Sequence, residues 1–190
     1  MSESPRYNGP SEDEMTDEQR RIRDSILKSR PRTGLSGPFG PWLAIPSIAE
    51  PAQLLGRACR YDTSLSLRES ELVILLTGAK FQCATEFEIH RSEALLAGLS
   101  PHLIDSIPHG IDFTIENVTE RVCSQLSSKR EKSVAVFTSE LLSTYTISER
   151  RYRSSLEELN GDPSTLVEIT SIVGYYTYVA FTLNVFRISP

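Results

Sequence analysis

Apolar residues recur along most of the chain at intervals of three and four, the spacing that predicts helices with a buried face. In residues 69–81, ESELVILLTGAKF, an apolar face is formed by Leu72, Leu75, Leu76 and Ala79. No stretch alternates apolar and polar residues between hairpin turns, so strands are not expected. The pattern therefore predicts an all-α fold of about eight helices.

Start and stop signals place the ends of these helices. Three Ser/Thr-x-x-Glu/Gln sequences resemble capping boxes, at Thr16–Gln19, Ser66–Glu69 and Ser128–Glu131. We predict helices over residues 17–30, 51–60, 67–81, 83–97, 101–107, 128–145, 148–159 and 162–186.

Two segments are not expected to form long helices. Met1–Glu18 is polar and carries six acidic residues, which predicts a flexible tail or surface arm before a single domain over 19–190. Residues 30–51 contain five prolines and three glycines, which exclude a long helix there. Phe39 and Trp42 indicate that this loop is packed down, either as a cover for the core or as the wall of a pocket.

Composition narrows the classes of partner. The net charge of −5 argues against nucleic acid, because phosphate binding needs a concentrated basic surface. Three cysteines without paired spacing favour a reducing compartment, and we expect a cytoplasmic protein. Residues 169–186 carry no charge, but they include seven hydroxyls and one amide, which predicts a buried helix rather than a membrane span.

Four residues with useful chemistry lie close together: Glu71, Cys83, Glu86 and His90. Steps of three and four place Cys83, Glu86 and His90 on one helix face. Cys83 would lie in the first turn, where backbone N–H groups favour a thiolate. Glu86 and His90 could share a proton, and burial would raise the pKa of the Glu86 carboxyl.

The spacing of these residues is also compatible with side chains that have no catalytic role. A Glu–His pair at this spacing is common on solvated helices, and a lone buried cysteine is often inert packing. A zinc site is not predicted, because the remaining cysteines, Cys59 and Cys123, are not placed as ligand partners. No glycine-rich phosphate loop appears, so we expect neither a metal nor an organic cofactor.

The stretch from Gly37 to Ser100 resembles the carboxymuconolactone decarboxylase and alkylhydroperoxidase-D-like family. The resemblance is carried by GPFGPWLAIPSIAEPAQLLGRACRY and LSLRESELVILLTGAKFQCATEFEIHRSEALLAGLS. Alkylhydroperoxidase-D proteins carry Glu, then Cys-x-x-Cys, then His, and Glu71, Cys83, Glu86 and His90 fall on that register. Glu86 replaces the second cysteine, which removes the dithiol needed for peroxide reduction and resembles the decarboxylase-like branch.

The second half resembles the family more weakly. Residues 168–174 echo residues 71–78 as a faint internal repeat, which needs a one-residue gap. The resemblance implies a homotrimer or higher homo-oligomer. The uncharged final helix is a candidate interface between subunits.

The resemblance implies a lyase of the decarboxylase type, in which His90 is the proton donor and Glu86 holds it. Glu71 would orient the imidazole or act as a second proton station. Cys83 would be a pocket wall or take a direct part. Arg60 and Arg91 are the nearest basic residues. Apolar and aromatic candidates for the substrate-binding wall are Phe39, Trp42, Phe81, Phe87, Tyr175, Tyr176 and Tyr178.

These walls favour a hydrophobic substrate, for example an aromatic polyketide-like acid or lactone of secondary metabolism. Dehydration, isomerisation and cyclisation would use the same groups. A thiol-dependent peroxidase is a second hypothesis, with Cys83 as the reactive thiol and Cys59 or Cys123 as a distant resolving partner. A non-catalytic, ligand-binding member of the family is a third.

Overall fold

The computed structural model describes residues 4–30 and 34–189, in which there are ten α-helices, eight of them of seven or more residues, and no strand. The predicted all-α class is confirmed. The helices are α1 (Asp17–Ser29), α2 (Phe39–Leu43), α3 (Pro46–Tyr61), α4 (Leu67–Lys80), α5 (Ala84–Leu96), α6 (Pro101–Asp105), α7 (Ile115–Arg121), α8 (Lys129–Thr144), α9 (Glu149–Glu158) and α10 (Pro163–Phe186). Short 3₁₀ turns cover Glu12–Glu14, Gly110–Asp112 and Cys123–Gln125.

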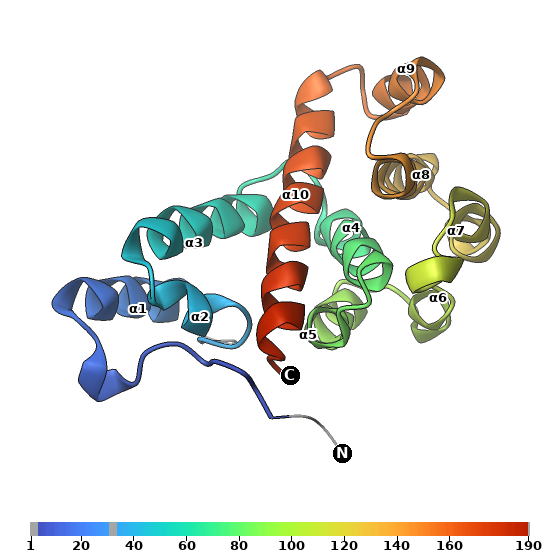
Figure 1. The fold of residues 1–190 in the computed structure, drawn as a ribbon. Coiled ribbons are helices and arrows are strands. Elements are labelled where there is room, and N and C mark those ends of the chain that lie inside the picture. Colours follow the sequence, from blue (N-terminus) through green and yellow to red (C-terminus); the bar gives the residue numbers. More distant parts are fainter. Residues whose placement is uncertain (1–3, 31–33, 190) are drawn as a thin grey trace.

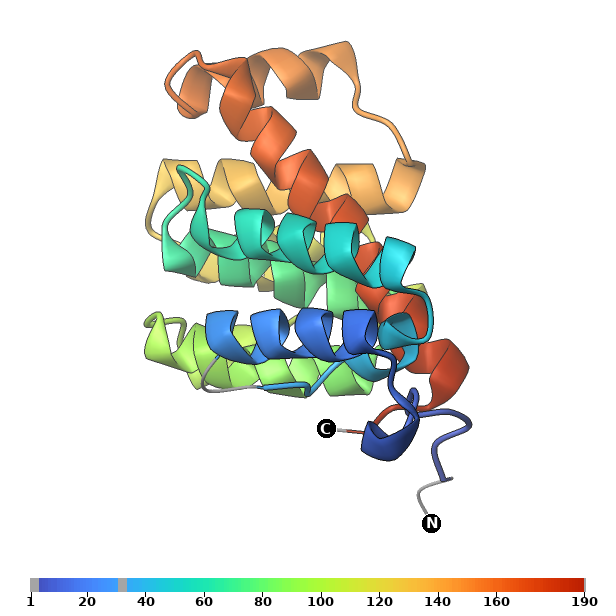
Figure 2. The same ribbon diagram turned by 90° about the vertical axis from the view of Figure 1, so that its left-hand side faces the viewer.

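The long helix α10 runs through the middle of the molecule (Figure 1). It packs against α3 on one side and against α4, α5 and α8 on the other. In a view turned by 90°, several of the remaining helices lie side by side, and α10 crosses them obliquely (Figure 2). The C-terminal helix α10 therefore packs against α3, a helix from the first third of the chain.

Helix α4 forms the centre of the core. Every residue from Glu69 to Ala79 is buried, because α5, α8 and α10 surround it. A helix that is enclosed on all sides buries its polar residues as well as its apolar ones. Glu69 and Glu71 are two positions apart and therefore point to different sides of α4. The two glutamates therefore belong to two different regions of the core, one on each side of α4.

Most predicted helix ends agree with the structure to within one or two residues. Thr16 and Ser66 each form a complete capping box, with Gln19 and Glu69 respectively. Ser128 accepts a hydrogen bond from the backbone of Glu131 and so caps α8. The Glu131 carboxylate instead accepts a hydrogen bond from Arg68 Nε at 2.6 Å. The third sequence is therefore a cap without the reciprocal half of the box.

The proline-rich segment is more helical than predicted. Helix α3 begins at Pro46, not at residue 51, and α2 precedes it. Pro46 occupies the first turn of α3, where a missing N–H costs nothing. Pro51 lies inside the helix, so α3 lacks the hydrogen bond that residue 51 would donate one turn back. Helix α7 was also not predicted.

The N-terminal segment lies against the end of α10. The Arg6 backbone N–H donates to Phe186 O at 2.9 Å, and Arg6 Nη1 donates to Val185 O at 3.0 Å. The rings of Tyr7 and Phe186 are 5.9 Å apart, and Met15 is buried. Residues 4–15, predicted as part of a tail or surface arm, thus connect the two ends of the chain.

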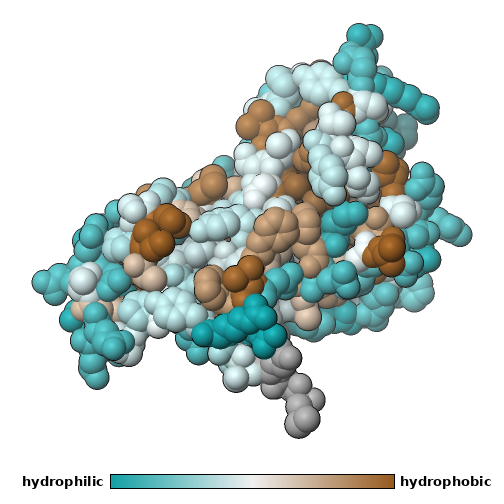
Figure 3. Space-filling view, in the orientation of Figure 1, coloured by the Kyte–Doolittle hydropathy of each residue, from teal (hydrophilic) through white to brown (hydrophobic). Residues whose placement is uncertain are grey.

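Helix α10 is long and apolar enough, by length and composition, to cross a membrane, and 56% of its apolar window is buried within the protein. The core helix of a soluble protein passes the same test. One side of α10 faces the core, as predicted, while Val167, Phe181 and Val185 are more than half exposed on the other. Apolar patches are visible on this face of the molecule (Figure 3).

Candidate active site

A histidine and a glutamate from different helices form a buried pair. His90 Nδ1 on α5 lies 2.7 Å from Glu71 Oε2 on α4. Both side chains are less than 10% exposed, and the ring of Tyr176 packs edge-on against the imidazole at 5.0 Å. Because the carboxylate accepts, Nδ1 carries the proton, and Nε2 is the ring nitrogen left for a ligand.

Glu86 is buried without a hydrogen-bond partner. Its side chain is 2% exposed, and neither carboxyl oxygen has a partner in the part of the chain that the structure describes. Burial raises the pKa of Glu86 well above its ordinary value. A neutral carboxylic acid follows, because an unpaired carboxylate is costly away from water. The predicted pairing of Glu86 with His90 is therefore not found: Glu71 takes that place.

One cavity of about 50 Å³ contains both Glu86 and His90. It lies where α3, α5 and α10 meet the loop that precedes α2. Glu71 is not part of its wall and contacts the cavity only through His90. The volume admits a few heavy atoms or waters and is too small, in this conformation, for a polyketide-sized acid. The wall is formed by Arg30, Ser36, Gly37, Pro38, Phe39, Gly56, Arg60, Glu86, Ile89, His90, Tyr175, Tyr176, Val179 and Leu183.

Two arginines give this wall a positive character. Arg60, one of the two basic residues predicted near the site, lies 3.3 Å from Glu93 through Nη2. Arg91, the other, forms an ion pair with Asp105 at 2.6 Å away from this cavity. Arg30 at the end of α1 was not predicted, and its guanidinium packs over the ring of Phe39 at 4.7 Å.

Glycine at position 56 lets one wall of the cavity form. A Cβ added to Gly56 on α3 would lie 2.1 Å from the hydroxyl oxygen of Tyr175 on α10. No larger side chain fits there unless Tyr175 moves. Burial raises the pKa of Tyr175 and Tyr176, although Arg30 and Arg60 respectively oppose the rise, so both remain neutral hydroxyls.

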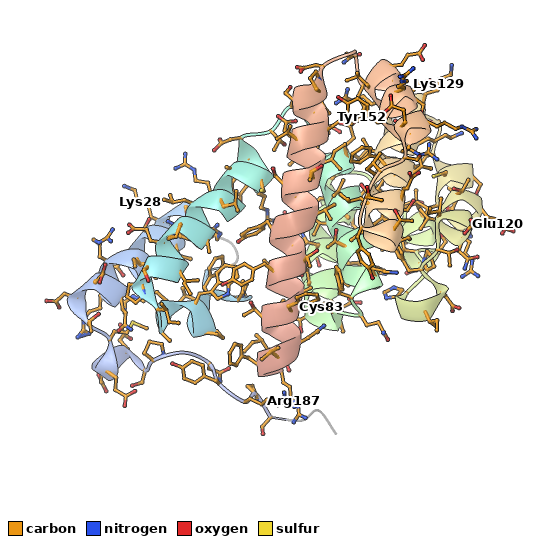
Figure 4. The ribbon with its side chains drawn as sticks, turned by 45° about the horizontal axis from the view of Figure 1, so that its top comes forward. Lys28, Cys83, Glu120, Lys129, Tyr152 and Arg187 are labelled. Atoms are coloured by element: carbon orange, nitrogen blue, oxygen red, sulfur yellow. The ribbon has the colours of Figure 1, made fainter. Side chains whose placement is uncertain are left out.

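Cys83 lies outside the cavity wall and does not have the predicted character of a thiolate. It is the N-cap residue of α5 and is 1% exposed. Burial raises the pKa of the Cys83 thiol to about 12, because desolvation outweighs the backbone hydrogen bonds that lower it. Figure 4 shows Cys83 inside the fold beside α10, whereas Lys28, Glu120 and Lys129 project outward. Cys59 and Cys123 are also buried and free.

Three of the seven residues predicted to form the aromatic wall line the cavity. Phe39, Tyr175 and Tyr176 do so. Trp42 instead stacks on Tyr178 at 4.6 Å, and its Nε1 donates to Thr182 Oγ1 at 3.1 Å.

The remaining two predicted wall residues lie elsewhere. Phe81 packs against Phe181 at a ring distance of 4.9 Å, and Phe87 packs on His109 beside a separate surface pocket. Aromatic character alone therefore does not distinguish a residue of the cavity wall from a residue of the core.

No group of three or more His, Cys, Asp or Glu residues with the geometry of a metal site occurs in residues 4–30 and 34–189. No family model matches the chain, and no curated protein matches it. The chemistry of the cavity therefore provides the basis for a functional proposal.

Proposed function

We propose that the protein is an enzyme that transfers protons within this cavity, a lyase of the decarboxylase type acting on a carboxylic acid or lactone. The observation that carries the proposal is the meeting of a buried His90–Glu71 pair and a neutral Glu86 in one cavity. An imidazole that can carry a proton to the substrate and a neutral carboxylic acid that can donate a hydrogen bond then face the same desolvated site. The resemblance to the carboxymuconolactone decarboxylase-like family is consistent with this assignment.

The proposed reaction gives each residue one role. The carbon–carboxylate bond of the substrate breaks, carbon dioxide leaves, and the electron pair moves onto an adjacent carbonyl as an enolate. Neutral Glu86 donates a hydrogen bond to the developing oxyanion. Nε2 of His90 first takes a proton from solvent and then transfers it to the carbon, while Glu71 positions the imidazole through Nδ1 and stabilises its charged form.

The size of the cavity favours a small substrate over the aromatic polyketide-like acid that the aromatic residues suggested. Dehydration, isomerisation and cyclisation through an enolate would use the same three residues. The peroxidase hypothesis has less support, because the Cys83 thiol is buried, has a raised pKa and does not line the cavity.

The test compares His90→Ala with Cys83→Ser on a panel of small oxo acids, carboxylated lactones and carboxylated aromatics. Mass spectrometry would follow the loss of carbon dioxide or water. We expect His90→Ala to abolish turnover and Cys83→Ser to retain it. Loss of activity in Cys83→Ser alone would contradict the proposal and favour a thiol enzyme.

We also infer that the chain forms a homo-oligomer through α10. The exposed side of α10 carries Val167, Tyr178, Phe181 and Val185 and no charged residue. Apolar hollows flank it, one shared with α3 and one with α8 and α9. Light scattering should report an oligomer for the natural chain and a monomer for Phe181→Glu, with a monomeric natural chain contradicting the inference.

A further inference from the structure

Arg30 is a buried cation without a carboxylate partner. The residue is 5% exposed. Nη1 donates to Ser29 Oγ at 2.9 Å and to Gln53 Oε1 at 3.4 Å, while Nη2 donates to Gln53 O at 2.9 Å. All three acceptors are neutral, and no hydrogen bond or ion pair joins Arg30 to a carboxylate among the residues that the structure describes. Burial lowers the pKa of Arg30, which reports the cost of desolvating its charge.

The second arginine of the cavity differs in this respect. Arg60 has Glu93 beside it. Burial lowers the pKa of Arg60, but the combined effect of Tyr176 and Tyr61 and of the carboxylates of Glu71 and Glu93 outweighs burial, so that the pKa is raised. Glu86, which could have balanced Arg30, is neutral. The cavity therefore holds one positive charge that the protein does not compensate.

The two buried groups that lack a partner of opposite charge or a hydrogen bond face the same cavity. Arg30 and Glu86 both line the cavity, and both oxygens of Glu86 lack a partner. Three of the five N–H donors of the guanidinium are used by neutral acceptors, which leaves donors for a ligand. A ligand that brings a negative charge to Arg30 and a polar oxygen to Glu86 would satisfy both.

We propose that Arg30 anchors a carboxylate that the substrate keeps throughout the reaction. A single uncompensated positive charge calls for one carboxylate at this end of the ligand, and the planar guanidinium matches the geometry of a carboxylate. This inference rests on the proposed function of the same cavity and identifies its substrate class as a small 2-oxo acid that carries a second, reacting carboxyl group beta to the oxo group.

The anchored carboxylate is distinct from the group that reacts. Pairing with a buried guanidinium stabilises a carboxylate as an anion, which opposes its loss as carbon dioxide. The bond that breaks must therefore belong to another part of the substrate, beside the oxygen that Glu86 contacts. The product should retain the carboxylate held by Arg30.

The experiment measures binding rather than turnover. Pyruvate, propanoate, propanamide and inorganic phosphate would be titrated into the full chain, with binding followed by the shift in melting temperature and by NMR line shifts. Arg30→Met removes the anchor. Arg91→Met is the matched control, because Arg91 is an arginine paired with Asp105 outside this cavity.

We expect pyruvate to bind more tightly than propanoate, and propanamide not to bind. Arg30→Met should weaken binding of both acids about tenfold or more, whereas Arg91→Met should not change it. Arg30→Lys keeps the charge without the planar fork, and it should bind the acids with intermediate affinity. This variant also provides the answer if Arg30→Met does not fold.

Three outcomes would overturn the inference: no binding of either acid to the natural chain, unchanged binding in Arg30→Met or Arg30→Lys, or phosphate binding as tightly as the acids. Failure of the proposed function is distinguishable. Binding that depends on Arg30, without any turnover, would support the role of Arg30 as an anchor and contradict the proposed enzymatic function. Turnover that requires His90 but not Arg30 would support the enzymatic function and contradict the role of Arg30.

Discussion

The two sides of α4 bury glutamates in opposite ways. On the side facing α8, Glu69 is 4% exposed and fully engaged: it accepts hydrogen bonds from Arg130 Nε at 2.7 Å and from the backbone and hydroxyl of Ser66. On the other side, where α4 packs against α5 and α10, Glu86 of α5 is 2% exposed and has no hydrogen-bond partner among the described residues. Similar burial therefore accompanies a satisfied structural carboxylate in one region and an unsatisfied carboxyl in the other.

A second pair of residues repeats the contrast. Glu140 on α8 is desolvated, which raises its pKa, yet hydrogen bonds from Ser148 and Arg151 outweigh this and the pKa is lowered. Arg30 on the cavity side has only neutral partners. Hydroxyls without partners, such as those of Thr138 and Ser155, occur near α8 and α9, but they do not ionise. Uncompensated charge is therefore the feature that distinguishes the cavity.

The largest effect that separates the two regions is on turnover. Glu86→Gln keeps the shape of the side chain but replaces the O–H donor of the carboxylic acid by the weaker N–H donor of an amide, so we expect kcat to fall, at most by the roughly 10²–10³-fold that loss of an oxyanion donor costs. Glu69→Gln is the matched control on the other side of α4 and should leave kcat unchanged. Steady-state kinetics on the substrate found in the panel would check both, and equal losses in the two variants would remove the distinction.

Stability should respond in the opposite order. Glu69→Ala removes the capping box of α4 and leaves Arg130 without its partner, so we expect a loss of about 2 kcal/mol. Glu86→Gln replaces an unpaired carboxyl by a neutral amide and should not destabilise the protein at neutral pH. Urea unfolding measures both, and destabilisation of Glu86→Gln by as much as Glu69→Ala would show that Glu86 is a structural residue.

The pH dependence of stability sharpens the same point. The pKa of Glu86 is raised in the folded state, so the folded protein keeps a proton that the unfolded chain releases above about 4.5. Stability contributed by this group is thus present below pH 4.5 and is lost as the pH rises towards the folded pKa. We expect a decline of up to about 1.4 kcal/mol per pH unit, absent in Glu86→Gln. Parallel pH profiles would contradict it.

Two helical glycines provide the smallest test. Gly56 faces the hydroxyl of Tyr175, so Gly56→Ala should overpack the cavity wall and cost about 1–3 kcal/mol. A Cβ added to Gly174 on α10 would meet no atom within 4 Å outside the local helix backbone, so Gly174→Ala should stabilise α10 by about 0.5–1 kcal/mol. Thermal unfolding compares the two, and a loss in Gly174→Ala would indicate that this position contacts another subunit.

Local signals in the sequence predicted the helices well. Capping residues such as Thr16 and Ser66 act within one turn, so the start of a helix can be predicted from residues adjacent in the sequence. Helix α2 and the early start of α3 were missed, because tertiary packing of Trp42 outweighs the helix-breaking tendency of the nearby prolines.

The chemistry of the site was only partly predictable. The sequence identified His90 and Glu86, but it favoured the neighbour four residues away over Glu71, which lies 19 residues away and meets His90 only through the packing of α4 on α5. The dipole argument for a Cys83 thiolate failed because it ignored desolvation. Arg30 had no local signal at all, since its importance depends on where α1 ends in space.

The proposed roles require Glu86 to be a neutral carboxylic acid at neutral pH. Infrared spectroscopy of the folded protein at pH 7 would detect the carbonyl stretch of a protonated carboxyl, with Glu86→Gln as the reference spectrum. We predict one such band in the natural chain and its loss in the variant. Identical spectra without the band would mean that Glu86 is ionised, and the proposed division of roles between Glu86 and His90 would then be wrong.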